Sequence, residues 1–318
     1  YILNNLKYDL LSDYIEYYFQ HQNIIKKYNF KSKFIITTNL LGKNADLIKK
    51  FFLAQQVNSK TKIIFVPHGG AIPIYKDQYF DYQNVVSRYY ISENKIKFRP
   101  NQLYLPYLNL KKIKKIKYNL INNSKLTLCM DEDDKFLYHF RSTHHFSDQD
   151  FYYQKIKEFS LKLNNNIRDR LNFKLYNAEK NWNTKQRFVN YFGKSSISKK
   201  NFLEETFHES RLIINTNLET ALYQSLKSGI PTIVFNLPNK YLRDVNFQKL
   251  IKEMIKNKIL FNNVDQMAKH INNIWDEPLK WWNSKEILKF RKYLDQNLSF
   301  KGKKNDLYYW KKFLSSIV

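Results

Sequence analysis

Strand-length apolar runs alternate with segments of helical periodicity along most of this chain. KFIITT (33–38) and KIIFV (62–66) have the apolar, β-branched character of strands. Between them, NADLIKKFFLAQQV (44–57) repeats its apolar residues at helical spacing. Strand, helix and strand in this order are typical of a parallel βαβ unit. The first part of the chain is therefore predicted to be an α/β domain.

A second series of the same kind begins with LTLCM (126–130), after the lysine-rich segment NLKKIKKIKYNLINN (109–123). Further strands are predicted at 171–176, 211–216 and 231–236, and helices near 151–164, 184–192, 220–229 and 246–258. From about residue 263 the pattern is wholly helical. We predict an α/β fold of two Rossmann-like parallel-sheet domains facing a cleft, the first at 1–118 and the second at 119–285, with a helical tail at 286–318 that braces the first domain.

Composition narrows the class of partner. The hydrophobic fraction of 43% is enough for a packed core, which excludes a disordered chain. The net charge of +26 and the pI near 9.7 favour an anionic partner such as nucleic acid, phospholipid headgroups, a phosphorylated substrate or an acidic polysaccharide. Solvated surface lysine without a dedicated partner explains the same charge equally well.

The cysteine content and the lengths of the apolar runs indicate where in the cell the protein is expected. The single cysteine, Cys129, excludes an intramolecular disulfide and a multi-thiolate zinc site, and its place in a predicted strand indicates a buried small hydrophobe. No apolar run approaches the roughly 20 residues that span a bilayer, and no signal-peptide pattern is present. A cytoplasmic protein is expected, with contact to a membrane surface left open. The chain begins at Tyr1 without methionine, which is compatible with a fragment of a longer protein.

The segment RLIINTNLETALYQSLKSGIPTIVFN (211–236) is the first candidate for chemistry. In a doubly wound sheet, ligands bind at the carboxyl ends of strands, where the next helix offers unpaired N–H groups to a phosphate. Thr216, Asn217 and Thr220 are therefore expected to hold a phosphate or a ribose. The competing interpretation is that Asn217 or Thr220 is only an N-cap.

Two other turns carry candidate residues. In VPHGG, His68 ends a predicted strand and Gly69 with Gly70 allows a sharp turn and a close approach to a ligand, so His68 is a candidate base or donor contact. Its alternative role is to cap a neighbouring helix. In the acidic turn DEDD (131–134), Asp131 lies nearest the strand end and is a candidate nucleophile or base. The sequence does not separate it from Glu132, Asp133 or Asp134, and a solvated acidic turn is the favoured alternative.

The C-terminal half of the chain contains further candidate residues for phosphate binding, metal binding and packing. Arg243 is expected to neutralise a leaving phosphate, with Asp244 orienting it or capping a helix. The histidines of HFRSTHH (139–145) match metal-ligand spacing only loosely, and no metal is expected. The tryptophans of the C-terminal helical region are assigned to packing: Trp275, Trp281 and Trp282.

Five stretches occur in an order that matches one bacterial family: HGG (68–70), LYNAEKNW (175–182), INTN…SGIPTIVF (214–235), LRD (242–244) and HINNIWDEPLKWWNS (270–284). From about residue 30 to 300 the chain resembles the C-terminal portion of the LIC12162-type transferase family of surface-carbohydrate biosynthesis. That family is similar in turn to retaining β-Kdo transferases of GT-B fold, which use CMP-activated ulosonic acids. The resemblance implies a GT-B-like fold.

The resemblance also implies donor-binding roles. Gln224 stands where the GT-B donor motif usually has a glutamate for a ribose hydroxyl, and a neutral amide makes a weaker bond there. Lys174 replaces an arginine, which turns a bidentate clamp into a point charge, and Glu179 replaces an aspartate. Arg141 matches an arginine suited to the carboxylate or phosphate of an acidic sugar nucleotide, and a surface loop is the competing interpretation.

These observations favour a glycosyltransferase that moves a sugar from a nucleotide donor to a bacterial surface glycan, with no cofactor and no metal. The donor is expected to be a nucleotide sugar and the acceptor a glycan or a lipid-linked glycan. The second domain is expected to be the donor-side domain and the first the acceptor-side domain. Three alternatives stay open: a glycerophosphotransferase using CDP-glycerol, a basic protein that binds single-stranded nucleic acid, and a carbohydrate-binding scaffold without activity.

Overall fold

The computed structural model describes residues 18–27, 32–38, 60–67, 87–107, 113–119, 124–132, 135, 149–176, 180–236 and 247–317. The predicted helix at 44–57 lies outside these described residues.

In the described part of the N-terminal region, helix α3 (Tyr18–Lys27) precedes a sheet of four parallel strands. The strands follow the chain in order: β1 (Phe34–Thr37), β2 (Lys62–Phe65), β3 (Tyr89–Ser92) and β4 (Gln102–Tyr104). The predicted strands at 33–38 and 62–66 are confirmed as β1 and β2. β3 and β4 were not predicted, because YYIS and QLY are too short to show a clear strand pattern.

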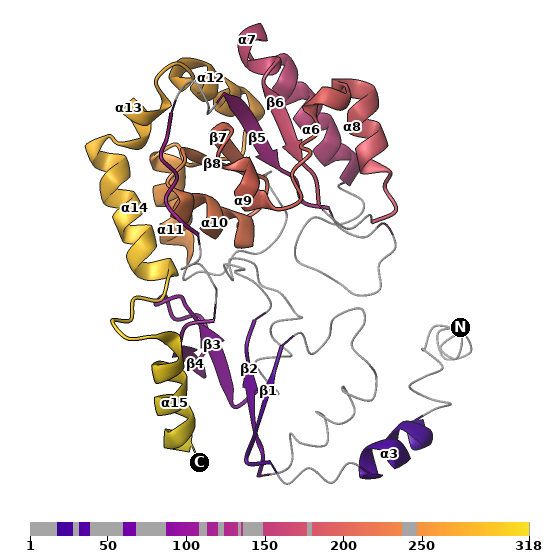
Figure 1. Cartoon of the computed structure of the whole chain (residues 1–318), viewed down its shortest axis with the longest axis vertical. Helices are drawn as coiled ribbons and strands as arrows, with labels where there is room; N and C mark the ends of the chain where they lie inside the picture. Colours follow the sequence, from indigo (N-terminus) through magenta and orange to yellow (C-terminus); the bar gives the residue numbers. More distant parts are fainter. Residues whose placement is uncertain are drawn as a thin grey trace.

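The second sheet has five parallel strands in the described residues, in the order β6-β5-β7-β8-β9. Their bounds are β5 (Lys125–Cys129), β6 (Leu171–Lys174), β7 (Ser210–Asn215), β8 (Thr232–Phe235) and β9 (Leu260–Phe261). The expectation of an α/β fold with two parallel sheets is therefore confirmed (Figure 1). Only the two-residue β9 was missed in this sheet.

The connecting helices are α6 (Gln149–Leu161), α7 (Asn165–Arg168), α8 (Thr184–Phe192), the 3-10 turn η3 (Lys194–Ser196), α9 (Leu203–Thr206), α10 (Thr220–Ser228) and α11 (Gln248–Lys256). The helical C-terminal region comprises α12 (Val264–Ile274), α13 (Pro278–Trp282), α14 (Lys285–Leu298) and α15 (Asp306–Ile317). Every helix predicted within the described residues is present. The four-residue helices α7 and α9 carry too few periodic positions to be recognised from the sequence.

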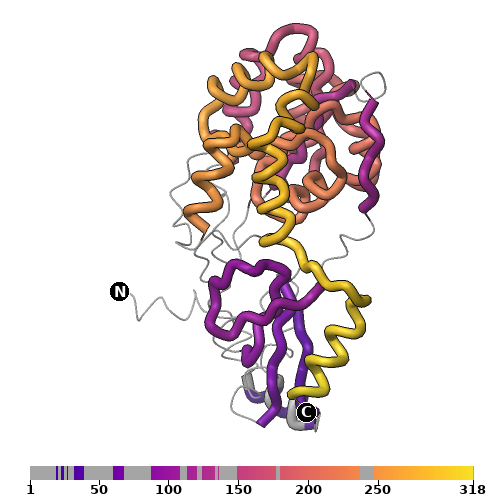
Figure 2. Tube along the Cα trace, turned by 90° about the vertical axis from the view of Figure 1, so that its left-hand side faces the viewer, coloured from indigo at the N-terminus to yellow at the C-terminus, as the bar shows by residue number. Residues whose placement is uncertain are grey.

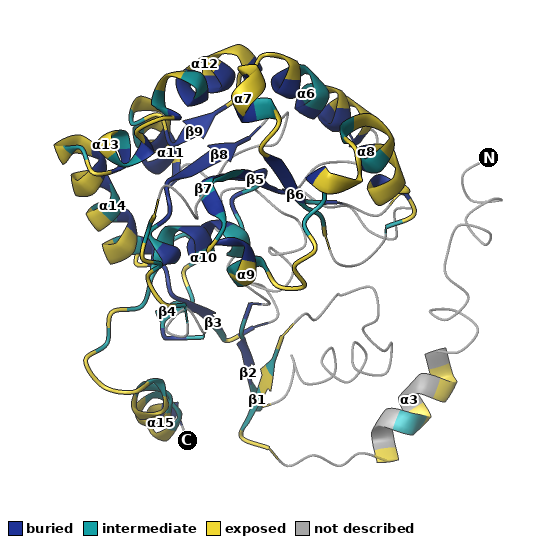
Figure 3. Cartoon of the chain, turned by 45° about the horizontal axis from the view of Figure 1, so that its top comes forward, coloured by how far each residue is buried: buried dark blue, intermediate teal, exposed yellow. Residues whose placement is uncertain are grey.

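Side-chain alternation along the strands builds a core on each face of the second sheet. One face packs Leu126, Leu128 and the strand neighbours Leu212 and Ile214 against α6 and α12. The other face packs Val234 and its neighbours against α10, α11 and α14. Both faces are covered, so the strands are buried between two layers of helices, as Figure 3 shows. Cys129 lies in this interior, as predicted, and burial raises the pKa of its thiol to about 12.

The C-terminal tryptophans are packing residues, as expected from their helical setting. Trp275 and Trp282 are buried, and Trp281 packs between the two core clusters. Trp282 Nε1 donates a hydrogen bond to the Gly229 carbonyl oxygen at 2.9 Å. This bond links the α13 segment to the end of α10, two stretches that are 53 positions apart.

The carboxyl end of β3 lies against the helices of the second sheet. Tyr223, in the first half of α10, donates from its hydroxyl to Asn94 Oδ1 at 3.2 Å, and the Lys95 N–H donates to the Asn297 carbonyl at 2.8 Å. Phe98 and Phe247 pack with ring centroids 5.9 Å apart. Because α10 starts at the carboxyl edge of the second sheet, that edge faces the first sheet, as Figure 1 shows.

The two final helices belong to different cores. α14 packs on the second sheet through Ile287, Phe290 and Leu294. α15 packs on the first sheet through Trp310, Phe313 and Ile317, and Figure 2 shows the two helices joined by a short extended segment. The boundaries at 118 and 285 stay predictions. None of the described helices is long and apolar enough to cross a bilayer.

Candidate functional site

The carboxyl edge of the second sheet is the place where the predicted donor-binding residues of the described chain gather. From β5 the chain goes to β6 on one side and then to β7 on the other, so β5 and β7 flank a topological switch point. Asp131, Lys174, Thr216 and Asn217 all follow or end a strand at this edge. Ligands of open parallel sheets bind in this position.

Thr216 ties β5 to β7 at the switch point. Its hydroxyl donates to the Cys129 carbonyl oxygen at 2.8 Å and accepts from the Asp131 N–H at 3.1 Å. The side chain is buried, and burial raises the pKa of the adjacent Tyr152 well above its usual value. Both hydrogen-bonding roles of the hydroxyl are thus used inside the fold. The consequence is a fixed backbone that presents Asp131, which is half-buried, at the edge.

Asp131 and its neighbour Glu132 differ in burial and in their contacts, although the sequence alone did not distinguish them. Glu132 is buried and accepts a hydrogen bond from Thr184 Oγ1 at 2.8 Å. The Thr184 hydroxyl is also bonded to the hydroxyl of Tyr153, which comes from α6. Glu132 is therefore held inside the fold, whereas Asp131 is half-buried just after the end of β5.

Helix α10 brings its amino end and three predicted residues to the same edge. Asn217 and Thr220 are half-buried in the turn and at the first helical position. The helix has nine residues, so its first turn presents N–H groups with the positive end of the helix dipole. The Glu219 side chain makes no cap bond to this turn, and the Leu222 N–H donates to the Glu219 carbonyl oxygen at 3.0 Å. Gln224 follows one turn later.

A polar cluster lies next to α10. Gln224 Nε2 donates to Glu204 Oε1 of α9 at 2.7 Å. Lys174 Nζ, at the end of β6, donates to the Asn201 carbonyl at 2.9 Å. Burial lowers the pKa of Lys174, and the neighbouring Cys129, Glu205 and Glu204 act in the opposite direction. Lys174, Glu204 and Gln224 therefore form one charged and amide-bearing group beside the switch point.

The end of α10 shows why the sequence has glycine and proline there. Gly229 has φ +83°, in the left-handed region that residues with a Cβ rarely adopt, and it terminates the helix. The Pro231 carbonyl then accepts from the Ile213 N–H at 2.9 Å, which sets β8 beside β7. Gly229 and Pro231 therefore have a structural role: they end α10 and start β8 beside β7.

A comparison with protein-family models gives one match, to the model described as LIC12162 family transferase, over residues 1–314 of the 318. The chain belongs to the LIC12162 family of transferases. A search of the curated proteins found no match to the sequence.

Several solved structures are similar to this LIC12162-family chain at low identity. One is the wall teichoic acid polymerase TagF, at TM-score 0.41 and 11% identity over 82% of this chain and 68% of that chain. A glycotransferase of kitacinnamycin matches at TM-score 0.47 and 8% identity over 94% and 80% of the two chains. A Thermobaculum terrenum O-GlcNAc transferase matches at TM-score 0.43 and 9% identity over 92% and 53%. The two parallel sheets themselves define the fold of this chain.

The remaining predicted residues of the LIC12162-type motifs lie outside the described residues: His68, Gly69, Gly70, Arg141, Glu179, Arg243 and Asp244. Their roles stay predictions. The same holds for the histidines of HFRSTHH. Among the residues that the structure describes, no group of three His, Cys, Asp or Glu side chains is arranged to hold a metal ion.

Glu204 is the residue at this site that the sequence did not single out. It lies on the four-residue α9, twenty positions before Gln224, and it carries no motif of its own. The only signal was the pair of adjacent glutamates in NFLEETF (201–207), which is compatible with any exposed helix start.

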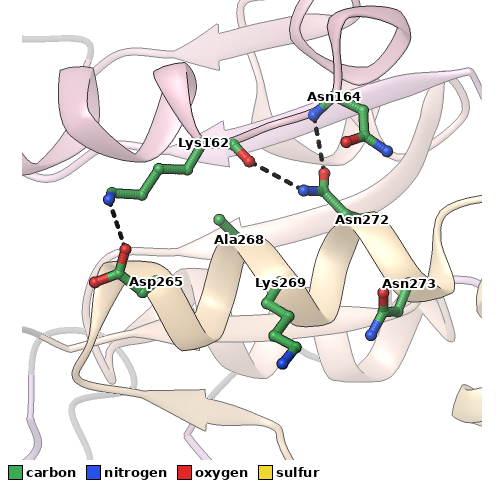
Figure 4. Close-up of a pocket in the computed structure, with 7 residues that line it drawn as sticks. All are labelled: Lys162, Asn164, Asp265, Ala268, Lys269, Asn272 and Asn273. Carbon is green, nitrogen blue, oxygen red and sulfur yellow. Dashed lines mark hydrogen bonds and ion pairs between the residues drawn. The ribbon is translucent and has the colours of Figure 1, made fainter.

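A separate hollow of about 370 Å³ lies between α12 and the turn after α6 (Figure 4). Asn272 accepts from the Asn164 N–H and donates to the Lys162 carbonyl, each at 3.0 Å, and Lys162 pairs with Asp265 at 2.6 Å. These contacts fasten α12 to the α6–α7 turn. None of the residues that line the hollow belongs to the carboxyl edge, so we assign it a structural role.

Proposed function

We propose that this LIC12162-family transferase is a glycosyltransferase that moves a sugar from a nucleotide donor to a bacterial surface glycan. The observation that supports it is the convergence at one carboxyl edge of the α10 amino end, Asn217 and the cluster of Lys174, Glu204 and Gln224. This edge flanks the switch point between β5 and β7. The nucleotide would bind here, and the acceptor would approach from the side of the first sheet.

The phosphate of the donor fits the amino end of α10. The N–H groups of the first turn and the helix dipole favour an anion there, and Asn217 in the preceding turn adds a side-chain amide. Lys174 at the end of β6 supplies a positive charge on the other side of β5. A departing phosphate needs donors of this kind, so neither a metal nor another cofactor is part of the proposal.

The ribose fits the Gln224–Glu204 pair. A carboxylate accepts stronger hydrogen bonds than an amide does, and Glu204 sets a carboxylate against the Gln224 side chain. The two residues together offer acceptor oxygens to neighbouring hydroxyls of a sugar ring. Glu204 would thus supply the charge that a glutamate carries in the usual GT-B motif.

In the reaction, the acceptor hydroxyl gives its proton to a base while its oxygen bonds to the anomeric carbon, and the bond from that carbon to the donor phosphate oxygen breaks with its electron pair on the phosphate. Asp131 is the carboxylate of the described edge that could act as base or nucleophile, because the Thr216 contact holds its backbone at the switch point. We propose His68 and Asp244 as further groups of the reaction. Arg141, Glu179 and Arg243 would bind the donor.

The donor class that we favour is a CMP-linked ulosonic acid such as Kdo. Such a donor carries a sugar carboxylate besides its phosphate, and the strongly basic chain suits the second anion. Arg141 is the proposed partner of that carboxylate.

Mass spectrometry of reaction mixtures tests this proposal. The chain is incubated with acceptor glycans and, in parallel, with CMP-linked ulosonic acids, other nucleotide sugars and CDP-glycerol. Transfer from a CMP-linked ulosonic acid is the expected result, and a sugar adduct on Asp131 would identify the nucleophile of a double displacement. Transfer only from CDP-glycerol would replace the proposal by a glycerophosphotransferase, and no transfer from any donor to any acceptor would contradict it.

A further inference from the structure

The outward side of α15 and of the turn before it combines lysines with apolar side chains. We call it the α15 basic face and define it as Lys303, Lys304, Leu307, Tyr308, Lys311 and Lys312. Leu307 and Tyr308 are 60% and 39% exposed, and all four lysines are exposed. Within the described part of the chain these lysines form no ion pair.

The opposite side of α15 is fixed to the first sheet. Trp310 Nε1 donates to the Pro106 carbonyl at 2.7 Å, and Phe313 packs edge-on against Tyr89 with ring centroids 5.2 Å apart. Ile317 is buried, and its carbonyl accepts from Lys62 Nζ. Because these contacts use one side of the helix, Leu307 and Lys311 cannot turn inward without breaking them.

The turn that leads into α15 is packed as well. Phe300 lies between Tyr104 and Tyr309, with ring centroids 4.7 Å and 4.9 Å away. A Cβ on Gly302 would clash with the rings of Tyr309 and Phe300, so a larger residue would displace this packing. The Lys304 ammonium lies 4.0 Å from the centre of the Tyr308 ring. The α15 basic face is therefore preorganised, which lowers the entropy cost of binding.

We infer that the α15 basic face docks on the surface of an anionic lipid bilayer. Leu307 and Tyr308 would enter the boundary between headgroups and acyl chains, and the four lysines would pair with lipid phosphates. An exposed aliphatic side chain among lysines suits a bilayer better than nucleic acid, where bases stack on aromatic rings. A two-fold dimer through this face would oppose lysines to lysines, which like-charge repulsion disfavours.

The inference is independent of the donor assignment, because α15 packs on the first sheet and the proposed nucleotide site belongs to the second. If both hold, the docked face would bring the acceptor side of the protein to lipid-linked glycans at the membrane.

Co-sedimentation of the full chain with lipid vesicles tests the inference. Vesicles of phosphatidylcholine with about one third phosphatidylglycerol are compared with pure phosphatidylcholine. We expect partitioning to the anionic vesicles that weakens as salt is raised. The double variant Lys311→Gln/Lys312→Gln should lower the partition coefficient about 25-fold, since each lysine contributes roughly 5-fold.

Lys185→Gln/Lys194→Gln is the matched control, because it removes the same charge from exposed positions of α8 and η3, on the other side of the molecule in Figure 1. The control should change partitioning less than about twofold. Leu307→Ser should weaken the binding that persists at high salt. Equal losses in the two double variants, no sedimentation with anionic vesicles, or binding to single-stranded DNA but not to vesicles would each overturn the inference.

Discussion

Gln224 and Glu204 meet side chain to side chain, with Gln224 Nε2 donating to Glu204 Oε1 at 2.7 Å. The contact joins α10, which follows β7, to α9, which precedes it. It lies beside Lys174 at the end of β6, so a carboxylate, an amide and an ammonium share one edge of the second sheet. A donor ribose beside this pair would meet a charged acceptor although the motif position itself holds a neutral residue.

Removing either member of the pair should weaken nucleotide binding. Gln224→Ala and Glu204→Gln should each raise the dissociation constant about tenfold, because a hydrogen bond to a charged group contributes roughly 1.5–3 kcal/mol. Isothermal titration calorimetry with the preferred nucleotide measures the change. Gln186→Ala is the control, since Gln186 is an exposed helical glutamine with a comparable bond to Asn190. Unchanged affinity in both site variants would remove the ribose role.

Losing the Thr216 hydroxyl should destabilise the fold. Thr216→Val keeps the shape but removes the hydroxyl that accepts from the Asp131 N–H and donates to the Cys129 carbonyl, which then keeps only its 3.3 Å bond from the Thr216 N–H. We expect a loss of about 1–3 kcal/mol in the free energy of unfolding, measured by urea denaturation. Thr216→Ser restores the hydroxyl and should recover most of the loss. A valine variant as stable as the unaltered protein would show that the tie between β5 and β7 contributes nothing.

Replacing Gly229 by a residue with a Cβ should destabilise the protein because of the backbone conformation at this position. Its φ of +83° lies in the left-handed region, and a Cβ added there would meet no surrounding atom within 4 Å, so the cost is conformational and not steric. Gly229→Ala should lower the free energy of unfolding by about 1–2 kcal/mol, as measured by thermal or urea denaturation. Gly229→Asn, which tolerates this region better, should lose less. Equal losses in the two variants would contradict this explanation.

His270 should make stability depend on pH. It is buried between Phe261 and Trp281, and burial followed by the charge of Lys258 lowers its pKa from 6.5 to about 4. Between pH 6.5 and 4, His270 is protonated in the unfolded chain but neutral in the folded protein, and this difference favours unfolding. The full free energy of unfolding is therefore present above about pH 6.5, and part of it is lost as the pH falls toward 4. The loss should approach about 3 kcal/mol.

Urea denaturation at several pH values between 4 and 7 measures this effect. His270→Phe removes the titrating group and should flatten the profile in that interval. A variant whose stability falls as steeply as that of the unaltered protein would assign the acid sensitivity to other groups.

Most of the second sheet could be predicted from the sequence, because β5, β7 and β8 are buried on both faces and read as continuous apolar runs. Gly229 and Pro231 marked the end of α10 through their backbone preferences. β3 and β4 carried no such signal, since YYIS and QLY are short and their pairing is set by tertiary contacts.

The candidate site was predictable only in part. Strand ends located Asp131, Lys174 and Asn217 at one edge, because parallel strands present their carboxyl ends together. The contact of Glu204 with Gln224 depends on how α9 packs, and a four-residue helix has no periodicity to reveal it. The separation of Asp131 from Glu132 depends on Thr184, which comes from a helix 52 positions away in the sequence.

The central claim is that a nucleotide binds at the carboxyl edge of the second sheet. Saturation-transfer NMR with CMP, UDP and GDP tests it most directly, on the unaltered protein and on a double variant Asn217→Ala/Gln224→Ala. We predict saturation transfer to one of the three nucleotides, strongest for CMP, and its loss in the double variant. Failure of all three to bind, or undiminished transfer in the double variant, would contradict the account.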